Sequence, residues 1–407
     1  MLTSSVTTSV GQDAATTPQD DPTRVPVSQR PHPEFEPLGI RWNSLLLYPS
    51  VKTRAVFDSN VFSAPQNPQH DFAVVVSPGV TVRSQTPTAS YQAEIGADIY
   101  RYNTFNSQDR EDIFARLRTR NEISRDLLFE TSFEAARRHE TRRDASALLD
   151  TKEPVPYNNL QAEATVTKTF NRFGVGFGAG IRNLTYEDVE SISGGTLDQS
   201  WRNGTILSTT LKPFYEFSPG YRVYSRLRLN TRDYEGEGDR NRDSEGYDAR
   251  GGVEFPLTPL IFGSLEAGYL SQTYKNPLIE PVHGLSGGTK LTWLVTPLMT
   301  ISLAADRTVA ETTTQDIDSR LDTSGLLKID YELLRNLIVK TGVEYVNQDF
   351  QGIKRKDDVL KLSIGFDYLM NRSIEIGAKY DFIDRASTDP LHSYDAHVVM
   401  FNVTAQR

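Results

Sequence analysis

The sequence predicts an all-β protein: a transmembrane antiparallel up-and-down β-barrel of about 18 strands, with short periplasmic turns and longer outer loops. Three observations predict this fold. Apolar and polar residues alternate along many segments, these segments follow one another along most of the chain, and the connections between them alternate between short and long. Residues 40–407 carry the pattern and are expected to form the barrel. Residues 1–39 are rich in Pro, Thr and Gln and are expected to form a disordered extension.

The alternation has a period of two residues. Between residues 374 and 382, Ile374, Ile376, Ala378, Tyr380 and Phe382 alternate with Glu, Gly, Lys and Asp. Because successive side chains of a strand point to opposite faces, such a segment has one apolar and one polar face. A soluble β-sandwich shows the same alternation, so the length and spacing of the segments have to decide between the two folds.

Length and spacing favour the membrane barrel. Each segment runs for roughly 13 to 16 residues, more than the 5 to 6 of a soluble sandwich strand and enough for a tilted strand that crosses a bilayer. The short connections carry Pro, Gly, Asn or Asp, which tight turns require; they lie at residues 124–126, 171–172, 218–220, 258–259, 296–297, 334–336 and 370–372. The long connections lie near residues 58–70, 140–157, 187–202, 234–245, 275–283 and 385–393.

Composition is consistent with an outer-membrane location. The 18 Tyr and 19 Phe residues often stand near the segment ends, as in the aromatic girdles of membrane barrels. The net charge of −9 argues against a nucleic-acid partner, and the lack of cysteine excludes disulfides and thiolate metal sites. No signal peptide is evident in residues 1–20. Either the natural start lies upstream, the chain is trimmed, or the location is not the outer membrane, and the regular strand pattern favours the first two.

Several short motifs resemble a known family. They lie at residues 47–62, 71–72, 77–80, 270–274, 292–298 and 332–336, and they are features of turns and strand ends. Over about residues 38–407 the chain resembles the putative β-barrel porin 2 family of bacterial outer-membrane proteins. The resemblance implies a link to exopolysaccharide production, with outer-membrane lipid, a polysaccharide or other hydrophilic solute, and periplasmic export components as partners. The chain ends on Arg407, where such barrels usually end on an aromatic residue.

If the apolar faces contact lipid, the polar faces surround a lumen. The turn at 124–126 places Arg116 opposite Glu134 and Arg120 opposite Glu130, and such cross-strand pairs stabilise a sheet. These charges form either a neutralised wall or a surface that selects solutes. An inward tyrosine at position 224 either packs or stacks on a sugar. The predicted pore-lining residues are Arg116, Arg118, Arg120, Glu130, Glu134, Arg222, Tyr224, Arg226, Arg228, Arg250 and Glu254.

Alternating glycines between residues 174 and 180 lie on one inward face. They leave room for a loop or plug to pack there, or they let the strand bend.

The sequence offers no constellation for catalysis. No nucleophile motif accompanies the histidines, and no metal-ligand spacing or phosphate-binding glycine loop is present. We therefore expect no enzymatic activity, no catalytic residue, no cofactor and no metal site. The leading hypothesis is a channel for hydrophilic solutes linked to exopolysaccharide export. The alternatives are a general diffusion porin and a structural or surface barrel plugged by its own loops. The length of the outer loops argues slightly against a long constricting loop.

Overall fold

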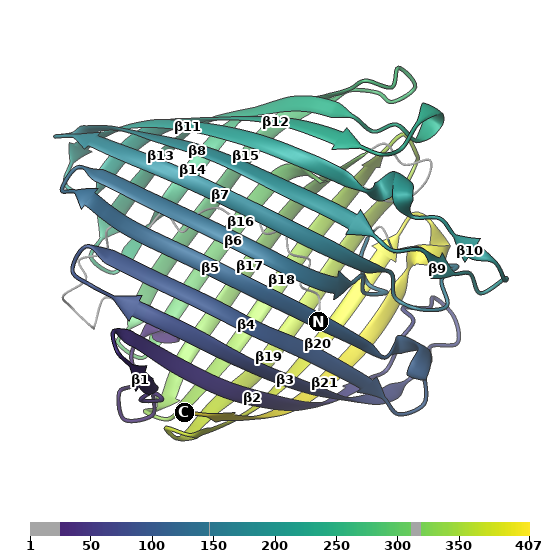
Figure 1. Ribbon diagram of the computed structural model, residues 1–407, viewed down its shortest axis with the longest axis horizontal. Coiled ribbons are helices and arrows are strands. Elements are labelled where there is room, and N and C mark those ends of the chain that lie inside the picture. Colours follow the sequence, from purple (N-terminus) through teal and green to yellow (C-terminus); the bar gives the residue numbers. More distant parts are fainter. Residues whose placement is uncertain (1–24, 146, 311–318) are drawn as a thin grey trace.

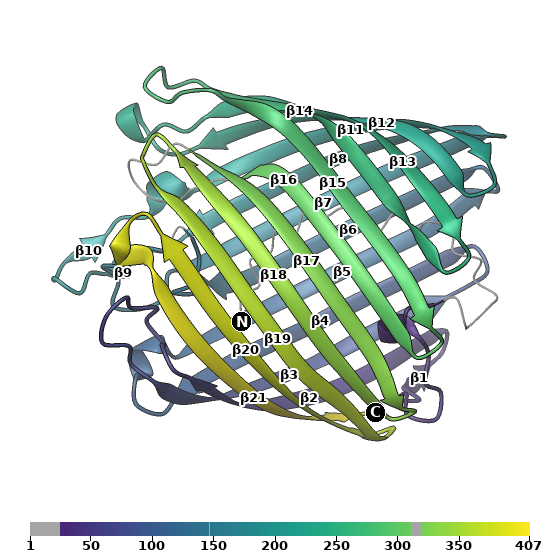
Figure 2. The ribbon, with the colours of Figure 1, turned by 180° about the vertical axis from the view of Figure 1, so that it is seen from behind.

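The computed structural model describes residues 25–145, 147–310 and 319–407. Within these residues, 18 long strands form one closed antiparallel barrel (Figures 1 and 2). Every pair of sequence neighbours among them is hydrogen-bonded, as expected of an up-and-down barrel. The barrel strands are β2 (Leu45–Asp58), β3 (Asp71–Gln85), β4 (Ala89–Tyr102), β5 (Arg110–Ser124), β6 (Leu127–His139), β7 (Pro156–Phe170), β8 (Phe173–Tyr186), β11 (Gly204–Ser218), β12 (Tyr221–Tyr234), β13 (Ser244–Thr258), β14 (Ile261–Tyr274), β15 (Val282–Thr296), β16 (Met299–Ala310), β17 (Ser319–Leu334), β18 (Leu337–Gln351), β19 (Lys356–Asn371), β20 (Ile374–Ser387) and β21 (Tyr394–Gln406).

The barrel closes where β2 pairs with β21, and β2 also pairs with β3 on its other side. A short strand, β1 (Ile40–Trp42), adds to the start of β2. Two further strands, β9 (Val189–Glu190) and β10 (Thr196–Leu197), form a small ribbon that projects from the outer end (Figure 1). No described helix is long and apolar enough to cross a membrane. The helical turns are η2 (Val27–Gln29), η3 (Asn106–Gln108), η4 (Ser200–Arg202), η5 (Gly238–Arg240) and η6 (Pro390–His392).

The short turns at the periplasmic end follow from local backbone chemistry. Asn171 and Gly220 occupy them with φ angles of 56° and 78°, in the left-handed region that Asn and Gly tolerate best. Register shifts accompany six of these turns, as is common for β-bulges at the rim of a barrel. All seven predicted short turns are present, and an eighth, which the sequence analysis missed, joins β3 to β4 at residues 86–88.

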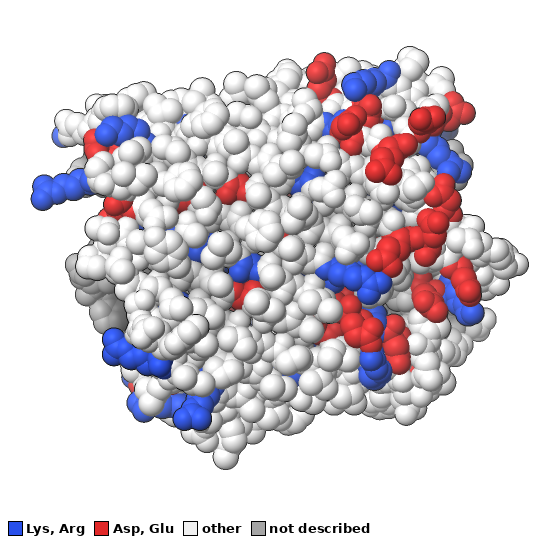
Figure 3. Space-filling view, viewed as in Figure 1, with Lys and Arg blue, Asp and Glu red and all other residues white. Residues whose placement is uncertain are grey.

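The outer surface of the barrel is apolar between two charged ends. On β12, Val223, Leu227 and Leu229 are exposed on the outside. In Figure 3, Lys, Arg, Asp and Glu gather mainly toward the ends, above all at the end that carries β9 and β10. An apolar belt of this kind matches the hydrocarbon layer of a membrane.

Residues 25–39 contact the periplasmic end of the barrel, and we call them the periplasmic strap. Val27 is 1% exposed, and its backbone N–H donates to the hydroxyl of Thr300 at 3.0 Å. The guanidinium of Arg30 binds the buried carboxylate of Glu332 at 2.9 Å. The sequence analysis expects disorder for residues 1–39, of which 1–24 lie outside the described residues. The division between this extension and the barrel stays a prediction.

Candidate functional site

The outer loop between β6 and β7, residues 140–155, turns into the barrel. The Arg143 guanidinium donates to both carboxylate oxygens of Asp58, at 2.7 and 2.8 Å. The Arg385 guanidinium donates to the backbone carbonyl of Arg143 at 2.8 Å, and Ala145 packs against Phe350. These partners stand on β2, β18 and β20, so the loop reaches almost to the opposite wall. We call it the inward loop.

The inward loop corrects the expectation that the length of the outer loops argues slightly against a long constricting loop. Its 16 residues, at about 3.3 Å each, can reach roughly 25 Å out and back. Its charged side chains form buried ion pairs and hydrogen bonds inside the barrel, and these contacts offset the free-energy cost of desolvating the charges. Loop length alone is therefore a poor guide to where a loop lies.

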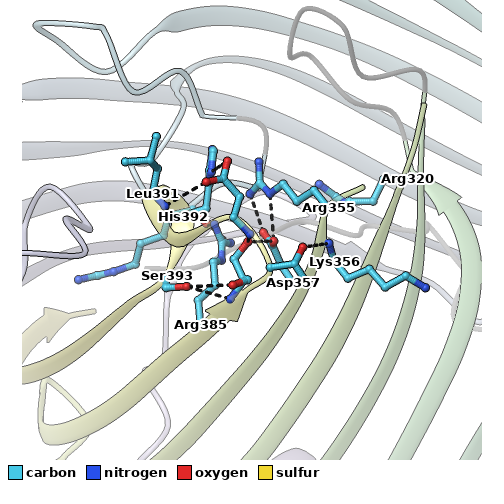
Figure 4. Close-up of polar contacts among 12 residues, drawn as sticks. Arg320, Arg355, Lys356, Asp357, Arg385, Leu391, His392 and Ser393 are labelled. Carbon is cyan, nitrogen blue, oxygen red and sulfur yellow. Dashed lines mark hydrogen bonds and ion pairs between the residues drawn. The ribbon is translucent and has the colours of Figure 1, made fainter. Parts of the chain in front are cut away.

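A polar cluster on the opposite wall supports the tip of the inward loop (Figure 4). Arg355 donates two hydrogen bonds to the carboxylate of Asp357, at 3.0 and 2.5 Å, and both side chains are almost fully buried. The hydroxyl of Ser387 also donates to Asp357, at 2.6 Å. The Arg355 guanidinium lies 4.3 Å from the centre of the Phe350 ring. This cluster therefore holds the aromatic ring on which the loop tip packs.

Burial perturbs the titration of the inward loop. It raises the pKa of Glu140 and of Asp144, although the nearby Arg202 opposes the rise at Glu140. Burial, together with the charge of Arg110, lowers the pKa of Arg142 to about 10. The loop is thus held in a poorly hydrated position inside the barrel.

A cavity of about 1130 Å³ lies beside the inward loop, enclosed by the loop and by the inner faces of strands from β7 to β19. Loop residues from Glu140 to Ala145 line one side of it, and Val25, Pro26 and Gln29 of the periplasmic strap line another part. Twelve of the lining residues are Lys or Arg and nine are Asp or Glu. The lining therefore has an excess of cations, whereas the whole chain has a net charge of −9.

One wall of this cavity is built around a buried arginine. Arg250 on β13 is only 3% exposed and binds Asp248 at 2.8 Å, Glu266 at 2.8 Å and Asp306 at 2.9 Å. Glu266 also accepts a hydrogen bond from Arg226 at 2.6 Å. Arg226 and Arg250 are directly opposite each other in the register of β12 and β13. Because like charges in that position repel, the shared carboxylate of Glu266 stabilises the pair.

The neighbouring arginines on β12 differ in their partners. Arg222 binds Glu216 at 2.9 Å and lies 3.8 Å from Glu254, which also binds Lys212 at 3.0 Å. Arg228 makes no hydrogen bond or ion pair with any residue that the structure describes. The hydroxyl of Tyr224, between them in sequence, donates to Glu266 at 3.1 Å.

The arginines of β5 are paired more simply. Arg116 binds Glu134 at 2.8 Å and Arg120 binds Glu130 at 2.8 Å, which confirms the predicted register of β5 and β6. Arg118, between them, is exposed and has no hydrogen-bond or ion-pair partner among the described residues. None of these five residues lines the large cavity.

Four of the predicted pore-lining residues do line the cavity: Tyr224, Arg226, Arg228 and Glu254. Arg250 lies buried behind its carboxylate partners, and Arg222 lies toward the periplasmic turn. That any of these residues lines a conducting path stays a prediction.

The carboxylates that bind Arg250 are not among the predicted pore-lining residues. Glu266 could have been predicted from the alternation of the strand, because it lies on the same face of β14 as Phe262 and Ser264. Asp306 stands on β16, and two strands, β14 and β15, lie between it and Arg250 on β13. No single turn joins β13 to β16, so a turn cannot predict this contact. The inward loop was missed because loop residues carry no periodic signal.

The described residues do not suggest metal chemistry. Among them, no group of three or more His, Asp or Glu side chains is arranged to hold a metal ion. What the arrangement offers instead is a polar, charged cavity inside a barrel, narrowed by a loop.

A membrane-spanning barrel with a polar lumen of this kind defines a channel protein of the outer membrane. A family model described as "Putative beta-barrel porin 2" matches residues 32–407. The chain belongs to this family. It is a porin-like channel of the bacterial outer membrane and is not an enzyme.

Solved structures with a similar barrel were also found. The channel OccK2 (OpdF) of Pseudomonas aeruginosa is 8% identical, with 89% of this chain and 97% of that chain covered and a TM-score of 0.48. The siderophore receptor PirA of Acinetobacter baumannii is 7% identical, with 89% and 80% covered and a TM-score of 0.47. The channel DcaP of the same organism is 13% identical, with 91% and 99% covered and a TM-score of 0.44. No match was found among curated proteins.

Proposed function

We propose that this channel passes small hydrophilic solutes across the outer membrane through the cavity that the inward loop narrows. The observation that carries the proposal is the position of the loop, which leaves a polar space of about 1130 Å³ beside it. A space of this size accommodates a small solute more readily than a bulky polymer.

The electrical conductance of the refolded protein in a planar lipid bilayer tests this proposal. The wild-type protein should conduct steadily. Asp58→Asn should increase the conductance several-fold, because it leaves the buried Arg143 guanidinium without its countercharge. Breaking a buried ion pair in this way typically costs about 3 to 5 kcal/mol, which is enough to release the loop.

The matched control is Arg137→Gln. Arg137 stands at the outer end of β6, and its ion pair with Glu187 is exposed, with both side chains more than 40% accessible. This change should leave the conductance unaltered. Equal conductance of the wild-type and Asp58→Asn proteins would show that the loop does not limit flow. A folded barrel with no conductance in either form would favour the plugged structural barrel.

The same recording tests the exopolysaccharide role that the family resemblance implies. Reversible block by an acidic polysaccharide would support that role and would direct attention to periplasmic export components. A current that is indifferent to the polysaccharide, but reduced by small solutes, would favour the passage of small solutes. Indifference to both would favour a general diffusion porin.

A further inference from the structure

The inner face of β12 carries cations and no acids. Along this strand the inward positions hold Arg222, Tyr224, Arg226, Arg228, Asn230, Arg232 and Tyr234, while Val223, Leu227 and Leu229 face outward. From Tyr224 to Tyr234, every inward residue lines the cavity. A solute in the cavity therefore meets a row of guanidinium groups on this side.

Two of the carboxylates close to this row, Glu266 and Asp248, already accept hydrogen bonds from other residues. Glu266 accepts hydrogen bonds from Arg226, Arg250 and Tyr224. Asp248 lies opposite Arg228 in the register, but it accepts from Arg250 and from the hydroxyl of Ser286 at 2.7 Å. With their acceptor sites used in this way, these acids are poor partners for a further cation.

Within the part of the chain that the structure describes, the Arg228 guanidinium is left without such a carboxylate. It is partly exposed to the cavity and makes no hydrogen bond or ion pair within the described residues. Glu163 and Asp248 act on it only through space. Five N–H donors in a planar fork thus remain available, and this geometry matches the two oxygens of a carboxylate.

The wall beside Arg228 is made of small residues. Thr210 on β11 lies opposite Arg228, and Gly178 on β8 lies opposite Thr210. Gly176 and Gly180 flank Gly178 on the same face. A Cβ atom at Gly178 would lie 3.2 Å from the hydroxyl of Thr165, so even a methyl group would crowd this part of the wall. Of these glycines, Gly180 lines the cavity together with Ser208, which lies opposite it in the register of β8 and β11.

We infer that Arg228 and the small-residue wall beside it form a binding site for small organic anions that carry a carboxylate, such as sugar acids. This inference deepens the proposed function, because it names the class of solute that the cavity takes. The carboxylate would accept hydrogen bonds from Arg228, and the polar body of the solute would lie over Ser208 and Gly180, the residues of this wall that line the cavity. The other β12 cations raise the local concentration of anions around the site.

Binding is tested apart from conduction, so that failure of the two proposals can be told apart. The probe is glucuronate, titrated by calorimetry into the refolded barrel in detergent. The wild-type protein should bind it, and Arg228→Gln should weaken binding by about tenfold or more, as loss of a charged hydrogen-bond donor predicts. Arg118→Gln is the matched control. Arg118 is an inward arginine that has no partner among the described residues, and it lies outside the cavity lining. It should bind as the wild type does.

The second measurement is the reversal potential in a KCl gradient across a bilayer. The wild-type channel should prefer chloride to potassium, and Arg228→Gln should reduce that preference by about twofold, whereas Arg118→Gln should not. Equal effects of the two substitutions, or no glucuronate binding by the wild type, would overturn the inferred site. Binding that depends on Arg228 in a barrel that does not conduct would retain the site and overturn the proposed channel function. Circular dichroism of each variant confirms that the barrel has folded.

Discussion

Two strands of the barrel, β5 and β12, each place a row of arginines on the inner face, yet the two rows have different surroundings. On β5, Arg116 and Arg120 face glutamates on the next strand, and both arginines are about a third or more exposed. On β12, Arg226 faces another arginine, Arg250, and the balancing carboxylates come from strands further away. On β5, Arg116 and Arg120 are neutralised by the next strand, and the unpaired Arg118 lies outside the cavity lining. On β12, Arg228 has no ion-pair partner among the described residues and lines the cavity.

The difference shows that a row of arginines has no fixed meaning. Whether such a row is neutralised depends on which residues lie opposite it on the next strand. It also depends on whether a buried cation already binds the nearby carboxylates. Because Arg250 is almost fully buried, it binds three carboxylates, and fewer remain for β12. Changes to these partners should therefore alter the β12 wall more than the β5 wall.

The largest effect is expected from Glu266→Gln. This change removes the charge that Arg226 and Arg250 share, and it leaves two cations directly opposite each other. We expect the free energy of unfolding to fall by about 3 kcal/mol, as in other broken buried pairs. The preference for anions should rise, because two positive charges lose a countercharge. Urea unfolding in lipid vesicles and the reversal potential measure the two effects, and unchanged selectivity would contradict the assignment of this wall to solute binding.

An intermediate effect is expected from pH, acting on the inward loop beside the cavity. Burial raises the pKa of Glu140 and Asp144 above their ordinary values of 4.5 and 3.8. The docked loop therefore binds protons more tightly than the free loop, so its stability is greatest at low pH and is lost as pH rises through the raised values.

Acidification from neutral pH to below 3.8, the ordinary pKa of Asp144, should slow hydrogen exchange in residues 141–145. The slowing should be about tenfold for each unit of pKa difference. The conductance should fall over the same range. Exchange rates are corrected for the intrinsic effect of pH on exchange, and a peptide from the β9–β10 ribbon serves as the reference. Faster corrected exchange at the lower pH would show that the ion pair of Glu140 with Arg202 outweighs burial.

The smallest effect is expected from Glu134→Gln, on the β5 side. Glu134 binds Arg116 and Arg138, but all three side chains are partly exposed to water. Unfolding free energy should fall by about 1 kcal/mol or less, as is usual for ion pairs in water. Ion selectivity should not change, because none of the three lines the cavity. A selectivity shift as large as that of Glu266→Gln would remove the distinction between the two walls.

Much of the barrel could be predicted from the sequence, because strand faces and tight turns are local properties. The turn at 124–126 was enough to place Arg116 opposite Glu134. The inward loop could not be predicted, since the pair of Arg143 with Asp58 joins residues 85 positions apart with no periodic pattern between them. The outer loops at 103–109 and 352–355 were also missed. The loop at 352–355 has only four residues, close to the two or three of the turns at the other end.

The seam between β2 and β21 has a consequence for assembly. It pairs Ser50–Asp58 with the last strand of the chain, residues 398–406. Until that last strand has arrived, the sheet has two open edges, and each edge presents unpaired backbone groups that can join another copy. The sheet therefore becomes a closed barrel only when the last strand pairs with β2. Substitutions that weaken the pairing of β2 with β21 should lower the yield of inserted protein. The molecules that do close should conduct as the wild type does.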